Sequence, residues 1–157
     1  MAEDSPNYIV SDLNGYDKPN PRKEPQMADK IIFTGTTHVK GGAEGYARST
    51  NGILDLALPQ PHPAAENLFA AAWSACFIGA VELAAGQRKI KLPASPEADT
   101  TIEVLMNDGG FFLRARLDIA VPGIDPVTAR ELIDNAHKIC PYSKAVEGNI
   151  DIELNLV

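Results

Sequence analysis

Cys76 and Cys140 are the residues of this 157-residue chain best placed to do chemistry beyond packing. The N-terminus lacks the basic segment and apolar stretch of a secretory signal, so we expect a cytoplasmic protein. Disulfides are rare in that compartment, so the two thiols are either inert and buried or a redox couple. Cys76 lies in the alanine-rich stretch ENLFAAAWSACF, residues 66–77, where a thiol can also pack as a small hydrophobe.

Cys140 directly precedes Pro141, and proline favours the first position of a helix. A short helical turn over residues 142–146 would make Cys140 its N-cap. The helix dipole would then lower the pKa of the thiol and favour the thiolate. The alternative is that Cys140 only ends the preceding helix.

The segment that carries Cys76 predicts a long buried helix over residues 64 to about 85. It holds no proline and one internal glycine, and its few polar residues are Glu66, Asn67, Ser74 and Glu82. A helix that is apolar nearly all round must be covered on most sides, which one half-buried sheet cannot do. We therefore infer an intertwined dimer with this helix near its centre. The apolar run over residues 68–81 is too short and too rich in alanine to predict a membrane span.

The remaining elements predict an α+β fold with mostly antiparallel strands and two principal helices. Asn51-Gly52 and Asp108-Gly109-Gly110 are hairpin signals, and Asp125-Pro126 is a helix start. Strands are predicted over residues 31–39, 46–50, 53–58, 101–107, 111–121 and 150–157, and the second helix over 126–138. In the fifth strand the alternation predicts one buried face, made of Phe111, Leu113, Ala115, Leu117, Ile119 and Val121.

Length and charge limit the organisation and the partners. Residues 1–28 are polar and hold four prolines, so we expect an N-terminal extension followed by a single domain over residues 29–157. The net charge of -7, with scattered basic residues, argues against a nucleic-acid partner. His137, Cys140 and Cys76 lack the tight ligand pairs of a zinc site, so no metal is expected.

Two stretches of the chain resemble the signature blocks of the organic hydroperoxide resistance proteins, within the larger family that contains the osmotically inducible OsmC proteins. In that family a glutamate precedes the first cysteine by ten residues, as Glu66 precedes Cys76 (76 - 66 = 10). A CPYS sequence then precedes a GNI stretch, as in residues 140–143 and 148–150. CPYS rather than CPIS favours the hydroperoxide resistance branch. The resemblance covers about residues 30–157 and implies the family's intertwined homodimer, with antiparallel sheets wrapped around long central helices.

The resemblance implies a thiol peroxidase that reduces alkyl or fatty-acid hydroperoxides. Cys76 would attack the peroxide and become a sulfenic acid, and Cys140 would condense with it to a disulfide. No cofactor would be bound, and the reductant would be an external dithiol, typically a lipoyl group carried by a protein. The apolar substrate tail would lie against a group of four side chains, unless these only pack in the core: Leu68, Phe69, Trp73 and Phe77.

The chain departs from the family at the residue that should favour the thiolate. Ala43 stands where the family has an arginine in the turn between the first two strands, and Arg48 is the nearest substitute, although a plain surface role suits it as well. Glu66 cannot meet Cys76 along an unbroken helix, so for a catalytic role either the helix kinks or Glu66 serves the other subunit's site. The alternative is that Glu66 only sits in the first helical turn, where a carboxylate favours the dipole. The rival hypotheses are a redox-sensing or small-ligand-binding member of the fold with weak or no turnover, and an interaction protein with inert thiols.

Overall fold

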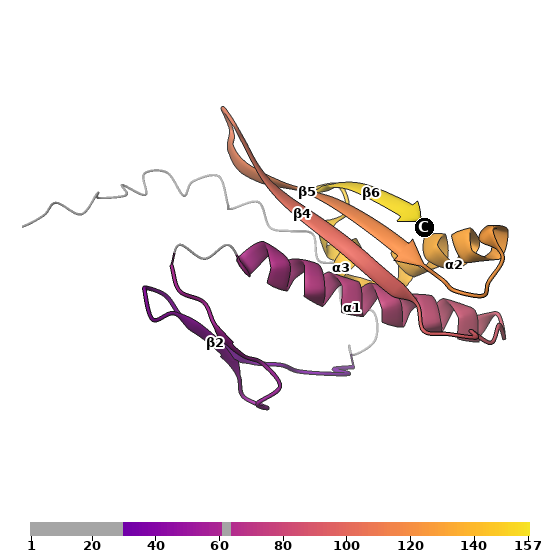
Figure 1. Ribbon diagram of the computed structural model, residues 1–157, viewed down its shortest axis with the longest axis horizontal. Helices are drawn as coiled ribbons and strands as arrows, with labels where there is room; N and C mark the ends of the chain where they lie inside the picture. Colours follow the sequence, from indigo (N-terminus) through magenta and orange to yellow (C-terminus); the bar gives the residue numbers. More distant parts are fainter. Residues whose placement is uncertain (1–29, 61–63) are drawn as a thin grey trace, which may run out of the picture. The chain divides into compact units, whose positions relative to one another are not determined.

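The computed structural model describes residues 30–60 and 64–157 (Figure 1). Residues 37–157 form one compact unit, and residues 30–36, the described part of a separate unit, form no helix or strand. The predicted extension over residues 1–28 lies outside the described residues and stays a prediction, as does a domain beginning at residue 29. All the elements below belong to the compact unit of residues 37–157.

Three short strands form the first antiparallel sheet, as predicted, and glycines shape its first turn. Gly42 has a positive φ of 97°, and a Cβ on Gly45 would lie 2.1 Å from the carbonyl oxygen of Leu58, so that position admits only glycine. The strands are hydrogen-bonded in chain order: β1 (Thr37–Lys40), β2 (Tyr46–Ser49) and β3 (Asp55–Ala57).

Two of these strands begin later than the sequence predicts. The strand expected over residues 31–39 starts only at Thr37, because its pairing with β2 ends at the Thr37–Ser49 pair. The third strand starts after Ile53, because the Ile53 backbone N–H donates a hydrogen bond to the Asn51 side chain (3.2 Å) and lengthens the turn. The hydrogen bond to the Asn51 side chain thus holds Ile53 in the turn, although its β-branched side chain favours a strand.

Helix α1 (Ala64–Gln87) confirms the long predicted helix and runs two residues past its expected end. One side of it lies in the core, where Trp73 and Phe77 are fully buried, while Leu83 on another side is 51% exposed. Within the described residues it is the one helix long and apolar enough to cross a membrane, with a mean hydropathy of 1.7 over an 18-residue window that is 33% buried. An apolar surface of this kind needs a cover.

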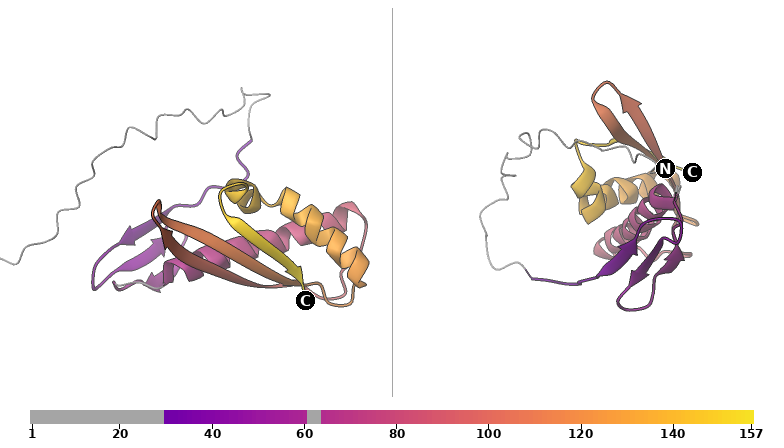
Figure 2. Two further views of the ribbon diagram at one scale, coloured as in Figure 1. Left: turned by 90° about the horizontal axis from the view of Figure 1, so that it is seen from above. Right: turned by 90° about the vertical axis from the view of Figure 1, so that its left-hand side faces the viewer.

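A second sheet packs against α1 and is built from β4 (Glu97–Asn107), β5 (Gly110–Ala120) and β6 (Asp151–Leu156). β4 and β5 are antiparallel, whereas β6 runs parallel to β5. A parallel neighbour requires a crossover, which α2 (Pro126–Ile139) and α3 (Pro141–Val146) provide. The helices lie on one face of this sheet (Figure 2).

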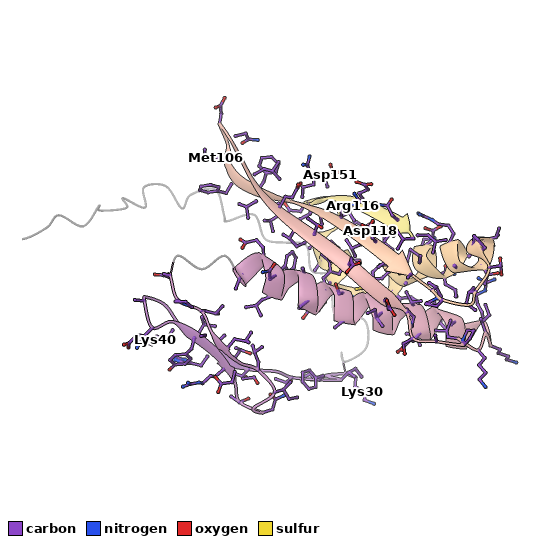
Figure 3. All side chains as sticks on the ribbon, viewed as in Figure 1. Lys30, Lys40, Met106, Arg116, Asp118 and Asp151 are labelled. Carbon is purple, nitrogen blue, oxygen red and sulfur yellow. The ribbon has the colours of Figure 1, made fainter. Side chains whose placement is uncertain are left out.

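The alternating pattern of β5 predicts its buried face only in part. Ala115, Leu117 and Ile119 are 0–1% exposed, as expected, but Phe111 is 78% exposed. Phe111 pairs with Met106 near the tip of the hairpin, where Figure 3 shows the strands running beyond the helices. Alternation gives the direction of a side chain but not the point at which the core ends.

Helix α2 begins at the predicted cap. The Asp125 carboxylate accepts a hydrogen bond from the Thr128 backbone N–H (3.0 Å), and Pro126 takes the first helical position. The apolar stripe of the helix is buried, as expected: Ala129, Leu132, Ile133 and Ala136. The α+β fold with two principal helices is confirmed.

Candidate active site

The two cysteines meet in the core although they are 64 residues apart in the chain. Their Sγ atoms lie 3.3 Å apart, and both thiols are free. Cys76 is half-buried in the middle of α1, whereas Cys140 is fully buried between α2 and α3. The predicted proximity of the two sulfurs is therefore confirmed.

Local chain geometry brings Cys140 to this position. Cys140 is the C-cap of α2, where its backbone N–H donates to the Ala136 carbonyl (2.8 Å), and it is also the N-cap of α3. Pro141 opens α3, as the sequence predicts. The Cys140 side chain makes no capping hydrogen bond to α3, so its sulfur is free to face Cys76. One residue thus ends one helix, begins another and presents a thiol.

Opposing effects set the acidity of the Cys76 thiol. Burial raises its pKa because it penalises the charged thiolate, and the interaction with the neighbouring Cys140 thiol raises it further. The backbone N–H of Tyr142, at the start of α3, lowers the pKa by favouring the thiolate. Burial wins, so the pKa of Cys76 lies above its ordinary value. A nucleophilic role at neutral pH therefore needs a further positive charge near the sulfur.

A hydrogen bond that the sequence analysis does not anticipate lies beside the cysteines. The Trp73 indole N–H donates to the Ser143 hydroxyl at 3.1 Å, and the two side chains are 0% and 1% exposed. Trp73 precedes Cys76 by three residues, and Ser143 follows Cys140 by three (76 - 73 = 3; 143 - 140 = 3). This matched spacing is the signal from which the contact could have been suspected.

The four side chains predicted to contact substrate divide into two groups. Trp73 and Phe77 are fully buried in the core, with Phe77 6.5 Å from the His137 ring, centre to centre. Leu68 and Phe69 are half-buried, and Leu68 helps line an apolar hollow of about 290 Å³. Only the second group is open to a ligand in the described chain, and substrate contact stays a prediction for all four.

Arg48 lies on the exposed face of the first sheet. Its Nε donates to the Asp55 carboxylate at 2.9 Å, and its guanidinium lies 4.2 Å from the centre of the Tyr46 ring. The Asp55 contact raises the pKa of Arg48. Within residues 30–60 and 64–157 no hydrogen bond or ion pair joins Arg48 to either cysteine, so its catalytic role stays a prediction.

Glu66 lies in the first turn of α1 and is half-buried. The helix is unbroken from Glu66 to Cys76, so the two residues are separated by about 15 Å along its axis. A kink between them is not observed. Glu66 therefore does not reach Cys76 along its own helix, its position in the first turn fits a carboxylate that favours the helix dipole, and a role in another subunit's site stays a prediction.

His137 is the histidine of α2 and precedes Cys140 by three residues. Its Nδ1 is buried without a hydrogen-bond partner in the described part of the chain. The described residues contain no group of three or more His, Cys, Asp or Glu side chains arranged to hold a metal ion. The chemistry available at this site is that of two adjacent thiols, which can cycle between dithiol and disulfide.

Comparisons with known proteins agree on one family. Residues 58–155 match the sequence profile of the OsmC-like proteins. The chain is 40% identical over 137 residues to the organic hydroperoxide resistance protein of Xanthomonas axonopodis pv. citri, which covers 82% of this chain and 96% of that protein. It is 35% identical over 133 residues to organic hydroperoxide resistance protein OhrB of Bacillus subtilis, with 80% and 98% covered.

Solved structures give the same result. The crystal structure of OhrB from Bacillus subtilis superimposes with a TM-score of 0.72 and 34% identity, covering 81% of this chain and 100% of that one. The crystal structure of an organic hydroperoxide resistance protein from Elizabethkingia anophelis gives a TM-score of 0.74 and 33% identity, with 82% and 98% covered.

Proposed function

The chain belongs to the OsmC-like family and, within it, to the organic hydroperoxide resistance proteins, and we propose on this premise that it is a cysteine-based peroxidase that reduces organic hydroperoxides to alcohols. The observation that carries the proposal is the 3.3 Å distance between the Cys76 and Cys140 sulfurs. Two thiols at this distance can become a disulfide with a shift of about 1.3 Å, since an S–S bond is about 2.05 Å long.

The proposed cycle assigns the first step to Cys76, because its sulfur is half-buried while that of Cys140 is fully buried. The Cys76 thiolate attacks one peroxide oxygen, the O–O bond breaks, and the alkoxide leaves and takes up a proton to become the alcohol. Cys76 is then a sulfenic acid. The Cys140 sulfur attacks the Cys76 sulfur, the S–O bond breaks, and hydroxide leaves with the Cys140 proton as water.

An external dithiol completes the cycle by supplying two electrons. One thiolate of the dithiol attacks the protein disulfide, and its second thiol releases the mixed disulfide, which leaves both cysteines reduced and the dithiol oxidised. A lipoyl group carried by a protein is the reductant we propose, and a cytoplasmic location suits a cycle that needs reduced thiols.

The substrate class follows from the apolar surroundings of the site. The side chains around Cys76 on α1 are mostly apolar. A hollow lined mainly by carbon lies beside Leu68, about 12 Å along the helix from Cys76, within the length of an alkyl chain. Burying a hydrocarbon tail there gains about 25 cal/mol per Å² of apolar surface, which hydrogen peroxide cannot gain. Alkyl and fatty-acid hydroperoxides should therefore be preferred.

A direct assay tests this function. The protein is incubated with an alkyl hydroperoxide or hydrogen peroxide, with and without a dithiol, and loss of peroxide is followed. We expect fast, dithiol-dependent loss of the alkyl substrate, no loss with Cys76→Ser, and one turnover ending in a sulfenic acid with Cys140→Ser. Loss of peroxide at an unchanged rate in Cys76→Ser would refute the proposal.

A second candidate function is a redox sensor or small-ligand binder with little turnover. Two observations favour it: the pKa of Cys76 is raised, and Arg48 is engaged with Asp55. A sensor would form the Cys76–Cys140 disulfide once on exposure to peroxide and be reduced slowly. The assay above separates the two, since a sensor gives the disulfide without repeated turnover.

We further propose that the protein works as a homodimer that covers the exposed side of α1. That side carries small residues at helical spacing, which lets a second helix approach closely: Ala71, Ala72, Ala75 and Gly79, followed by Leu83. In such a dimer Glu66 would serve the site of the other subunit, because the unbroken helix keeps it away from Cys76 of its own chain. Leu83→Glu should convert the dimer to monomer in sedimentation, whereas Val127→Glu, at an exposed position of α2 (71%), should not.

A further inference from the structure

Two side-chain contacts join α1 to the segment around Cys140, one helical turn apart. The first is the contact between Cys76 and Cys140, and the second is the hydrogen bond between Trp73 and Ser143. Because each pair is displaced by three residues on both segments, the two contacts form successive rungs between the same pair of elements. The hydrogen bond therefore restrains the separation and rotation of the elements that carry the sulfurs.

The hydrogen bond is unusual for its surroundings. In the part of the chain that the structure describes, Ser143 is the one fully buried polar or charged side chain, and its neighbours in the core are apolar. An alanine would fill this position without a polar group to satisfy. The hydroxyl is directional, however, and it ties the third residue of α3 to a fixed point on α1.

We propose that Trp73 and Ser143 are positioning residues whose hydrogen bond keeps the Cys140 sulfur close enough to the Cys76 sulfur to form a disulfide. The use of this contact in turnover rests on the proposed function, but its effect on the two thiols does not. Helix α3 has only six residues and follows α2 directly at Cys140, and within the described residues the bond from Trp73 to Ser143 is the one side-chain hydrogen bond that joins α3 to α1. Without the second rung α3 can rotate away from α1, and the sulfurs separate.

The contact bears on one chemical step in particular. Closure forms the S–S bond and breaks the S–O bond of the Cys76 sulfenic acid, with water leaving. The rate of this step depends on how often the Cys140 sulfur lies within reach, which is its effective concentration. The same contact keeps the Tyr142 backbone N–H at the Cys76 sulfur, where it favours the thiolate.

The experiment measures thiol proximity without any peroxide. The wild-type protein, Ser143→Ala and Trp73→Phe are equilibrated in glutathione redox buffers, and the fraction with the intramolecular disulfide gives the effective concentration of the thiols. We expect a fall of about tenfold or more in both variants, since a misplacement of about 1 Å can cost a hundredfold. The matched control is Ser74→Ala, which removes the hydrogen bond from Ser74 to Thr100 on the neighbouring strand (2.8 Å) and should leave the effective concentration unchanged.

The double variant Trp73→Phe/Ser143→Ala separates positioning from stability. Each single variant leaves a buried polar group unpaired, whereas the double variant removes both partners and should regain part of the lost resistance to denaturant. If the bond positions the thiols, the double variant keeps the low effective concentration. The pH profile of Cys76 alkylation should also move to higher pH in all three variants and stay in place in Ser74→Ala.

An effective concentration within twofold of wild type in Ser143→Ala would overturn the inference, and so would a double variant in which it recovers together with stability. Neither result touches the peroxidase proposal. Conversely, a wild-type protein that fails to consume hydroperoxide refutes the peroxidase proposal, but the glutathione experiment still tests whether the hydrogen bond positions the thiols.

Discussion

Oxidation of the cysteine pair should stabilise the fold, and the chain itself sets the size of the effect. Cys76 and Cys140 are 64 residues apart, so a disulfide would close a long loop in the unfolded state. The chain-entropy relation gives about 14 cal/mol/K for such a loop, or about 4 kcal/mol at 25 °C. Strain subtracts from this value, but the sulfurs start 3.3 Å apart and the required shift is small. We therefore expect a net gain of about 2 to 4 kcal/mol.

The assay compares guanidinium unfolding of two forms of the same protein at one protein concentration. The reduced form is held in dithiothreitol, and the oxidised form is made with diamide, so that the result does not depend on peroxidase activity. Mass analysis after alkylation confirms the intramolecular bond. In thermal unfolding of the same two forms, a gain of this size corresponds to a rise in melting temperature on the order of 10 °C for a chain of this length. Cys140→Ser, treated in the same way, should show no shift.

Two outcomes would refute this reasoning. If the oxidised form unfolds at the same denaturant concentration as the reduced form, the native fold must be strained by the bond as much as the loop entropy gains. If diamide instead yields a disulfide between chains, the sulfurs do not meet as the structure places them. Either result would remove the geometric basis of the proposed closure step.

Four further predictions concern the thiol, the cation it lacks, a helix cap and the core. Burial raises the pKa of Cys76, so its alkylation rate should still rise beyond pH 9. Ala43→Arg should raise hydroperoxide turnover at pH 7 about tenfold, because it supplies a cation that favours the thiolate, whereas Ala43→Gln should not. The hydrogen bond from the Thr128 backbone N–H lowers the pKa of Asp125. The stability that this carboxylate contributes is therefore present above about pH 4 and is lost as the pH falls through the lowered pKa. In acid titrations followed by circular dichroism, Asp125→Asn should lose less stability than wild type over that range. Leu117→Ala, at a fully buried position, should cost about 2 to 5 kcal/mol in urea unfolding.

Much of the fold could be predicted because its signals are local. The long helix follows from a run without proline, and the start of α2 follows from Asp125 and Pro126, whose capping geometry involves only neighbouring residues. The short helix after Cys140 follows from Pro141 in the same way. The limits of the strands could not be predicted, since pairing partners and the extent of the core are non-local. Phe111 belongs to the right face of its strand and yet lies in solvent.

The site could be predicted in its sulfurs and not in its supports. The spacing of Glu66 and Cys76 and the CPYS sequence identify the family, and with it the cysteine pair. The Trp73–Ser143 contact joins residues 70 positions apart, and the one sequence signal for it is their equal three-residue spacing from the two cysteines. Arg48 could be named from the sequence only as the nearest cation to an alanine, and its partner Asp55 becomes visible only in the register of β2 and β3.

The placement of the two sulfurs suggests a division of labour in the proposed cycle. Cys76 lies in the middle of a 24-residue helix, where its backbone is hydrogen-bonded on both sides and cannot shift alone. Cys140 is the single residue between two helices, so small changes in its backbone angles swing α3 against α2. The approach of about 1.3 Å that bond formation requires is therefore borne by Cys140. Rotation about Cys140 speeds disulfide formation only if a second contact limits its range. The hydrogen bond between Trp73 and Ser143, one helical turn away, limits it in that way.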